Sequence, residues 1–200
     1  MAPTQQQQQL ISILPRITSF TSLLGSLSIV IDVVQKYCTR GNSNSTLKTY
    51  HRLMLGMSFY DMVVSLAYFL GTWPIPADTP DTYATYGNEA TCKTQAFFIQ
   101  LSVGTAFYTL CLSVYYYLVI VKNSRPSLIL ERCMHFLCFS FAFGTAIAAL
   151  ALDILGYATV WCWIKVEHDL FLILISVAIL VWSPLGHNCH RRCDYVDHIF

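Results

Sequence analysis

Charged residues are scarce in this chain. Asp, Glu, Lys and Arg make up only 12% of its 200 residues, whereas hydrophobic residues make up 55%. An average soluble domain has roughly 25% charged residues, and it needs a polar surface that this composition does not supply. The composition therefore excludes an ordinary soluble domain and favours a chain that lies in lipid. The net charge of +1 also excludes a strongly basic nucleic-acid-binding protein.

Several catalytic patterns are missing as well. The sequence has no histidine pair typical of zinc proteases and no glycine-rich phosphate-binding loop. It also has no nucleophile elbow and no pair of catalytic carboxylates. Zinc-type ligands occur near the C-terminus, but their spacing fits no closed site; they are His187, Cys189, His190 and Cys193. The sequence therefore predicts no enzyme, no metal centre and no cofactor other than the ion considered below.

Charge-poor runs indicate five membrane-spanning helices, because about 20 apolar residues are needed to cross a bilayer. The predicted spans are residues 10–36, 53–76, 92–121, 132–152 and 169–186. None of them shows the alternation typical of a strand, so we expect an all-α integral membrane bundle over residues 10–186. Residues 1–9, of which 5–9 are all glutamine, are expected to form a solvated polar tail. Residues 187–200 are expected to form a second tail.

The charges between the spans predict the orientation. Basic residues gather in the segments around 36–52 and 122–132 and in the C-terminal tail, whereas the other connecting segments hold most of the acidic residues. Since basic loops stay in the cytosol, we expect the N-terminus outside, the C-terminus inside and the plasma membrane as the location. Cys92 and Cys162 then both face the oxidising side, where disulfides persist. A bridge between them would stabilise the fold by ~4 kcal/mol.

Asp61 lies within the second predicted span. A carboxylate near the bilayer centre costs roughly 2.5–3.5 kcal/mol, so it should face the bundle and have partners. Thr105, Thr109 and Ser113 recur at every fourth position of the third span and form a hydroxyl stripe, which we predict to face Asp61. Two interpretations stay open: a cation or proton site, with sodium as a candidate ion, or a protonated structural carboxyl group.

Aromatic residues crowd the outer boundary of the predicted bundle. An interfacial aromatic belt explains most of them. The alternative is a pocket for a small-molecule ligand, formed by Trp73, Phe97, Gln100 and Trp163.

The cytosolic boundary carries basic and aromatic residues on neighbouring predicted spans. We predict that they form a surface for a cytosolic partner. Its residues are Arg52, Tyr116, Tyr117, Lys122 and Arg125.

These features together resemble seven-helix G-protein-coupled receptors. The shared features are a basic first inner loop, Ser58-x-x-Asp61 in the second helix, a cysteine opening the third helix and Trp161-Cys162-Trp163 in the second outer loop. Residues 50–58 (YHRLMLGMS) followed by 72–76 (TWPIP) are similar to the cyclic-AMP-receptor-like and rhodopsin-like receptors of protists. The resemblance covers residues 22–185.

The resemblance implies roles for three of these residues. Asp61 would be the second-helix carboxylate that often coordinates sodium, and Cys92–Cys162 the shared outer disulfide. A ligand bound under the outer loops would then signal to a heterotrimeric G protein.

Two departures from the family pattern stand out. Residues 115–117 are three tyrosines where rhodopsin-like receptors have an acidic-Arg-aromatic triplet, and the sequence ends after the fifth predicted span. The chain is therefore expected to be a receptor truncated after its fifth helix. The alternatives are a non-signalling scaffold, which would pair with a full-length receptor, and a small transporter that uses Asp61.

Overall fold

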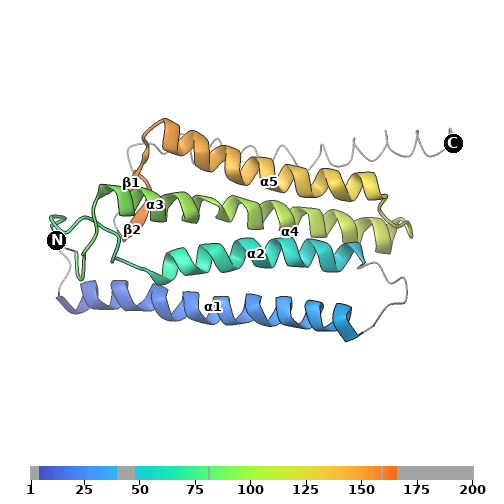
Figure 1. Ribbon diagram of the computed structural model, residues 1–200, viewed down its shortest axis with the longest axis horizontal. Helices are drawn as coiled ribbons and strands as arrows, with labels where there is room; N and C mark the ends of the chain where they lie inside the picture. The colour runs from blue at the N-terminus through green and yellow to red at the C-terminus, as the bar shows by residue number, and fades with distance from the viewer. Residues whose placement is uncertain (1–4, 40–47, 81, 159, 166–200) are drawn as a thin grey trace.

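The chain folds into long helices that lie side by side (Figure 1). The computed structural model describes residues 5–39, 48–80, 82–158 and 160–165. Its helices are α1 (Gln5–Thr39), α2 (Thr49–Phe69), α3 (Glu89–Gln100), α4 (Ser102–Tyr116), the π-helix η1 (Tyr117–Val121) and α5 (Leu128–Ala151). Helix α1 packs on α2, α2 packs on α3 and α4, and α4 packs on α5. The predicted span 169–186 and the C-terminal tail lie outside the described residues.

Three of the described helices are long and apolar enough to cross a membrane. They are Gln6–Cys38, Glu89–Val121, in which α3, α4 and η1 run on from one another, and Leu128–Ala151. Large apolar side chains remain exposed on them, such as Leu10 (65%) and Leu14 (63%) on α1 and Phe136 (70%) on α5. Exposed apolar surface of this extent is stable in lipid and unfavourable in water. The five-span count stays a prediction.

Two helix boundaries differ most from the predicted spans. Helix α1 begins at Gln5, within the stretch predicted as a solvated tail, and Gln6, Gln7 and Gln9 are exposed. Helix α2 ends at Phe69, although the apolar run continues to residue 76. Gly71 adopts a left-handed backbone (φ 58°), which ends helices and suits glycine. Pro74 and Pro76 then keep the following residues out of a helix.

The helix of the third predicted span is interrupted at Leu101. Its amide donates to the Phe98 carbonyl, and the amide of Gly104 donates to the Leu101 carbonyl. These bonds span three residues and tighten the turn between α3 and α4. Gly104 lies against the ring of Tyr60, where a Cβ would come within 2.7 Å of Tyr60 Cδ1. The absence of a side chain at this position therefore lets α4 approach α2 closely.

The described chain is mostly helical, but the prediction of an all-α fold misses a β-hairpin. Strand β1 (Leu155–Ala158) pairs antiparallel with β2 (Trp161–Ile164), with Tyr157 opposite Cys162. Along β2, Cys162 and Ile164 are buried, whereas Trp161 and Trp163, which alternate with them, are half-buried. This alternation is the period-2 pattern of a strand. It is too short to identify a strand beside the longer apolar runs.

Two hydrophobic clusters form the core. The larger one lies among α2, α4 and α5, where the Phe107 and Phe141 rings stack with centroids 4.5 Å apart. The smaller one lies at the hairpin end and includes Ile75, Ala96 and Leu155. We call the hairpin end of the bundle the outer end, and the end that carries Arg52 the inner end.

Candidate functional site

The outer end contains a disulfide bond. A disulfide joins Cys92 in the first turn of α3 to Cys162 of β2, and both residues are buried. The predicted bridge is thus confirmed. The Asn88 side chain accepts from the Thr91 amide and caps the first turn of α3, which stabilises the helix where the disulfide is attached. The hairpin is therefore held against a well-ordered helix end.

Gln95 connects three elements beneath this hairpin. Its side-chain nitrogen donates to the carbonyls of Ala67 (3.0 Å) and Gly71 (2.8 Å), and its oxygen accepts from the Cys162 amide (3.2 Å). Gln95 is only 2% exposed, so the bonds satisfy a side chain that would otherwise be costly to bury. Sequence reasoning missed this residue. The available signal was a polar side chain one turn after Cys92, directly before the apolar residues 96–99.

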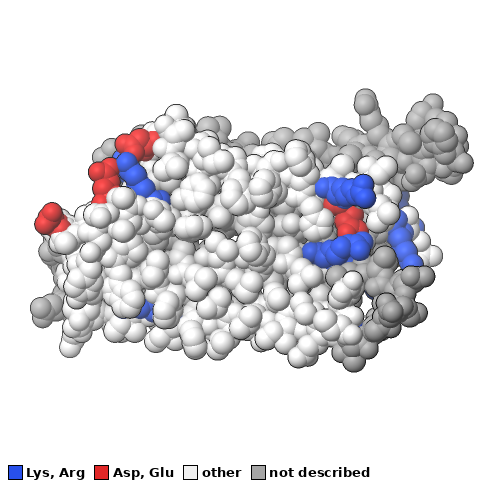
Figure 2. All heavy atoms as spheres, in the orientation of Figure 1, with Lys and Arg blue, Asp and Glu red and all other residues white. Residues whose placement is uncertain are grey.

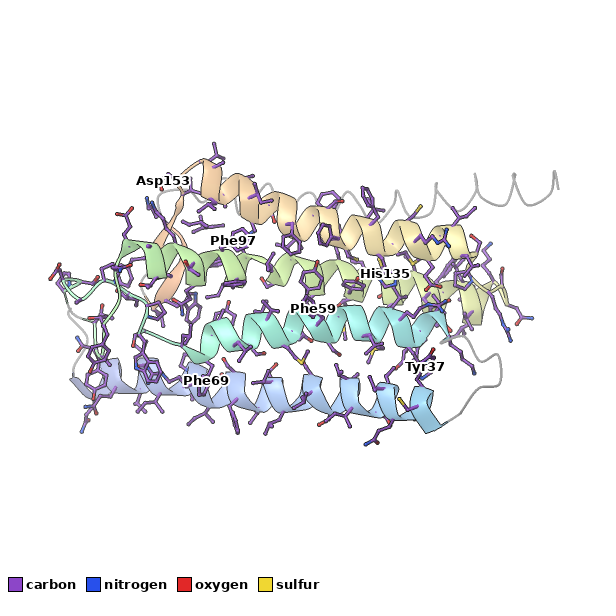
Figure 3. The ribbon with its side chains drawn as sticks, viewed as in Figure 1. Tyr37, Phe59, Phe69, Phe97, His135 and Asp153 are labelled. Carbon is purple, nitrogen blue, oxygen red and sulfur yellow. A yellow bond between two sulfur atoms is a disulfide. The ribbon has the colours of Figure 1, made fainter. Side chains whose placement is uncertain are left out.

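Three of the four predicted pocket residues lie together at the outer end. Trp163 Nε1 donates to Gln100 Oε1 at 2.9 Å, and Gln100 Nε2 lies 3.5 Å from Thr145 Oγ1. Phe97 and Trp163 both pack against the smaller hydrophobic cluster. Figure 3 places Phe97 on α3 near the hairpin. Gln100 is buried, so its amide presents a polar group inside a largely apolar part of the bundle.

The structure separates Trp73 from these three residues. Trp73 lies beyond the end of α2 and is 44% exposed. The guanidinium carbon of Arg16 on α1 lies 4.4 Å from the centroid of its ring, a cation–π contact. Trp73 also lines a cavity of about 700 Å³ between the outer ends of α2 and α3, which we call the outer groove. The predicted pocket is therefore wrong in grouping Trp73 with Gln100.

Asp61 meets one residue of the predicted hydroxyl stripe. Thr105 Oγ1 donates to Asp61 Oδ1 at 3.0 Å. Thr109 and Ser113 instead donate to carbonyls of their own helix and are exposed. One turn before Asp61, the Ser58 hydroxyl is buried and has no hydrogen-bond partner among the described residues. The oxygen atoms of Asp61 and Thr105, with Ser58 nearby in the sequence, are the type of ligand that a hard cation takes.

A second polar contact lies deeper in the bundle and was not predicted. The Tyr108 hydroxyl lies 2.8 Å from His135 Nδ1, which joins α4 to α5. His135 lies on the side of α5 that faces α4 (Figure 3). Gly56 makes room for this contact, because a Cβ there would come within 2.5 Å of the Tyr108 ring. The signal in the sequence was a histidine inside a charge-free run.

The inner end contains an ion pair between α2 and α5. Arg52 binds both carboxylate oxygens of Glu131 through Nε and Nη2, and Thr49 Oγ1 donates to Glu131 Oε2 at 2.7 Å. Arg52 is 31% exposed and Glu131 only 6%. Arg52 was predicted to belong to a surface for a partner, but its guanidinium is instead bound within the chain.

The other predicted inner-end residues differ in exposure. Tyr116, Lys122 and Arg125 are exposed, while Tyr117 packs against the larger cluster. Tyr116 lies beside Tyr50, with ring centroids 6.0 Å apart. A basic and aromatic surface therefore exists at this end, without Arg52 and with Tyr117 partly covered.

On the face that Figure 2 shows, charged side chains gather at the two ends and leave an uncharged band between them. At the outer end Lys93 binds Glu89 (2.7 Å) and Asp153 (2.6 Å). The hydrogen bond from Lys93, with the nearby charges of Lys93 and Lys165, lowers the pKa of the Asp153 carboxyl below its ordinary value. An uncharged band between charged ends is typical of a helical bundle embedded in a bilayer.

Comparison with known families identifies the chain. A family model described as slime mold cyclic AMP receptor matches residues 2–183. The chain belongs to this family. The resemblance inferred from residues 50–76 and from the cysteine pair is thereby confirmed, and the slime mold cyclic AMP receptor family is a family of receptors, not a class of enzymes. A search of curated proteins finds no significant match.

Proposed function

We propose that this member of the cyclic AMP receptor family binds an extracellular ligand at its outer end and signals to a cytosolic G protein. The observation that supports this most strongly is the closure of the outer end, where the Cys92–Cys162 disulfide holds Trp163 on Gln100. In this arrangement the N-terminus is extracellular, the C-terminus is cytosolic, and the bundle crosses the plasma membrane five times.

The ligand contacts Gln100, Trp163 and Phe97. Gln100 uses its oxygen for Trp163, whereas its nitrogen makes a long contact with Thr145 (3.5 Å) and no other hydrogen bond within the described part of the chain. We infer that this nitrogen is available to a ligand. The two aromatic rings offer flat surfaces on which a planar ligand can stack. Cyclic AMP, the ligand in the family's name, has a planar base with polar edges and is the first ligand to test.

Asp61 and Thr105 support a sodium site as part of this function. Their oxygens lie 3.0 Å apart on neighbouring helices, so an ion bound to both would link α2 to α4. Sodium takes oxygen ligands, and a carboxylate supplies the charge that balances it. The ion would stabilise one arrangement of these helices relative to others.

The test is ligand binding and nucleotide exchange by the 200-residue chain in cell membranes. We expect cyclic AMP to bind and to accelerate nucleotide exchange on a co-expressed G protein. Replacing Gln100 by Leu should weaken binding at least tenfold, since it removes the buried amide. Phe136→Leu is the matched control, because Phe136 is exposed on the apolar surface of α5, and should leave binding unchanged.

Other outcomes support the alternatives. Co-purification with a full-length receptor of the family, with no nucleotide exchange under any condition, would support the scaffold. Cation flux into liposomes that is lost in Asp61→Asn would support the transporter. Equal cyclic AMP binding by the parent and by Gln100→Leu would contradict the proposed ligand site.

A further inference from the structure

The outer groove lies apart from the proposed ligand site. Its walls are the outer parts of α2 and α3 and the loop that joins them. Apolar side chains dominate these walls, and several of them are exposed, including Leu66, Leu70 and Phe98. A cavity of about 700 Å³ with such walls is large enough for a small ligand or for part of a lipid chain.

Three polar side chains of the groove, those of Thr91, Thr94 and Gln95, are already bonded to the protein. Thr94 Oγ1 donates to the Ala90 carbonyl at 2.8 Å, and Thr91 Oγ1 donates to the Pro74 carbonyl at 2.9 Å. Gln95 makes the three bonds described above. A polar molecule in the groove would therefore lose its bonds to water and gain few in return. The groove favours an apolar occupant.

Arg16 provides a charge at the edge of this groove. Its guanidinium lies against Trp73, which lines the groove, and a Cβ at Gly71 would come within 2.8 Å of its Nε atom. The Nε and Nη2 atoms of Arg16 are buried and have no hydrogen-bond partner among the described residues. Lys93, also at the outer end, is by contrast paired with two carboxylates. Buried N–H groups of a guanidinium without an acceptor are unfavourable, so this site requires an anion.

We propose that the outer groove binds a phospholipid, with an acyl chain against α2 and α3 and the headgroup phosphate on Arg16. The planar guanidinium can donate two parallel hydrogen bonds to a phosphate. Tryptophan beside it is typical of the depth at which headgroups lie. A phospholipid supplies both the anion and the apolar chain that the groove requires. This inference does not depend on the proposed receptor function.

Fluorescence quenching can test the site directly. In a full-length variant with Trp161, Trp163 and Trp182 changed to Phe, Trp73 is the remaining tryptophan. The detergent-purified protein is titrated with a phospholipid brominated in its acyl chains, and in parallel with brominated diacylglycerol, which lacks the phosphate. We expect saturable quenching by the phospholipid at about tenfold lower concentration than by diacylglycerol. Inorganic phosphate at millimolar concentration should not compete.

Variants separate the two parts of the site. Arg16→Gln should abolish the tenfold preference for the phospholipid, whereas Lys122→Gln, at the inner end, should leave it unchanged. Thr94→Phe narrows the groove while retaining Arg16, and should weaken quenching by both lipids. An intact disulfide and an unchanged thermal transition establish that each variant is folded.

Three results would overturn the proposal. The first is equal quenching by both brominated lipids in the protein with Arg16. The second is an unaltered preference in Arg16→Gln. The third is displacement of the phospholipid by inorganic phosphate, which would indicate a site for a soluble anion.

Discussion

The two ends of the bundle are held together by different interactions. At the outer end, a disulfide, a buried glutamine with three hydrogen bonds and a hairpin fix α2, α3 and β2 relative to one another. At the inner end, α2 and α5 are joined by the partly exposed ion pair of Arg52 and Glu131 and by Thr49. The disulfide and the Gln95 bonds of the outer end are buried, and exposed ion pairs of Lys93 only supplement them. The ion pair that joins the helices at the inner end reaches the surface.

This difference suits a protein that receives a signal at one end and responds at the other. A ligand site gains affinity when its side chains are already in place. A surface that must change shape needs interactions that can break at small cost. Substitutions at each end measure how much its interactions contribute to the free energy of unfolding.

Removing the disulfide should have the largest effect. Cys162→Ser opens a loop between residues separated by 70 positions, and the chain-entropy relation gives ~4 kcal/mol of lost stability. Thermal unfolding of the purified protein in detergent measures it. Cys133→Ser, a change at a half-buried free cysteine, is the control. A loss below about 1 kcal/mol would mean that the hairpin is held without the bridge.

Replacing Gln95 by Leu should rank second. The change keeps the volume similar but leaves the carbonyls of Ala67 and Gly71 and the Cys162 amide without this partner, at a cost of about 3 kcal/mol. Thr94→Val is the matched control on the neighbouring, exposed position and should cost less than about 0.5 kcal/mol. Equal effects of the two variants would show that the Gln95 bonds contribute little.

Breaking the inner ion pair should have a smaller effect. Arg52→Gln leaves Glu131 with Thr49 as its partner. Because Arg52 is 31% exposed, we expect the free energy of unfolding to fall by about 2 kcal/mol. This is less than the roughly 3–5 kcal/mol lost when a fully buried pair is broken. Arg132→Gln, on the exposed position beside Glu131, should change the free energy of unfolding by less than about 0.5 kcal/mol. A larger loss in the free energy of unfolding for Arg52→Gln than for Cys162→Ser would mean that the inner interactions contribute more to stability than the outer ones.

The exposed Asp153–Lys93 pair should have the smallest effect and should depend on pH. Since the pKa of Asp153 is lowered in the folded state, its contribution is fully present above the ordinary value of 3.8. That contribution is lost as pH falls through the lower folded value. Asp153 has a left-handed backbone (φ 55°), which asparagine also tolerates. Asp153→Asn should therefore remove this part of the acid sensitivity without straining the backbone. Identical unfolding curves of parent and variant between pH 3 and pH 6 would contradict the assignment.

The sequence was sufficient to predict the long helices that the structure describes and the disulfide between Cys92 and Cys162. Charge-poor runs locate α1, α5 and the α3–α4 helix because lipid tolerates few charges, and the separation of basic from acidic loops brings Cys92 and Cys162 to one side. The end of α2 was not predictable from the apolar run. It depends on the left-handed backbone at Gly71, which a hydropathy pattern does not reveal.

The polar contacts between helices were less predictable. The contact of Thr105 with Asp61 was predictable, because a carboxylate in an apolar helix needs a partner. The rotation of the helix, however, leaves Thr109 and Ser113 exposed. Gln95 and Glu131 were missed because their partners lie on other elements, and spacing within one helix does not reveal them. Trp73 was misplaced for the same reason, since its contact with Arg16 on α1 is long-range.

The most direct test of the account is which end of the bundle faces the outside of the cell. Tyr86 (79% exposed) lies at the outer end, and Arg125 is exposed at the inner end. A cysteine introduced at either position can be labelled with a membrane-impermeant maleimide. The parent for this test has Cys38, Cys133, Cys189 and Cys193 changed to Ser, which leaves the Cys92–Cys162 disulfide and the buried Cys111 and Cys138. We predict labelling of Tyr86→Cys in intact cells and of Arg125→Cys only after permeabilisation. Labelling of Arg125→Cys in intact cells, with Tyr86→Cys protected, would contradict the account.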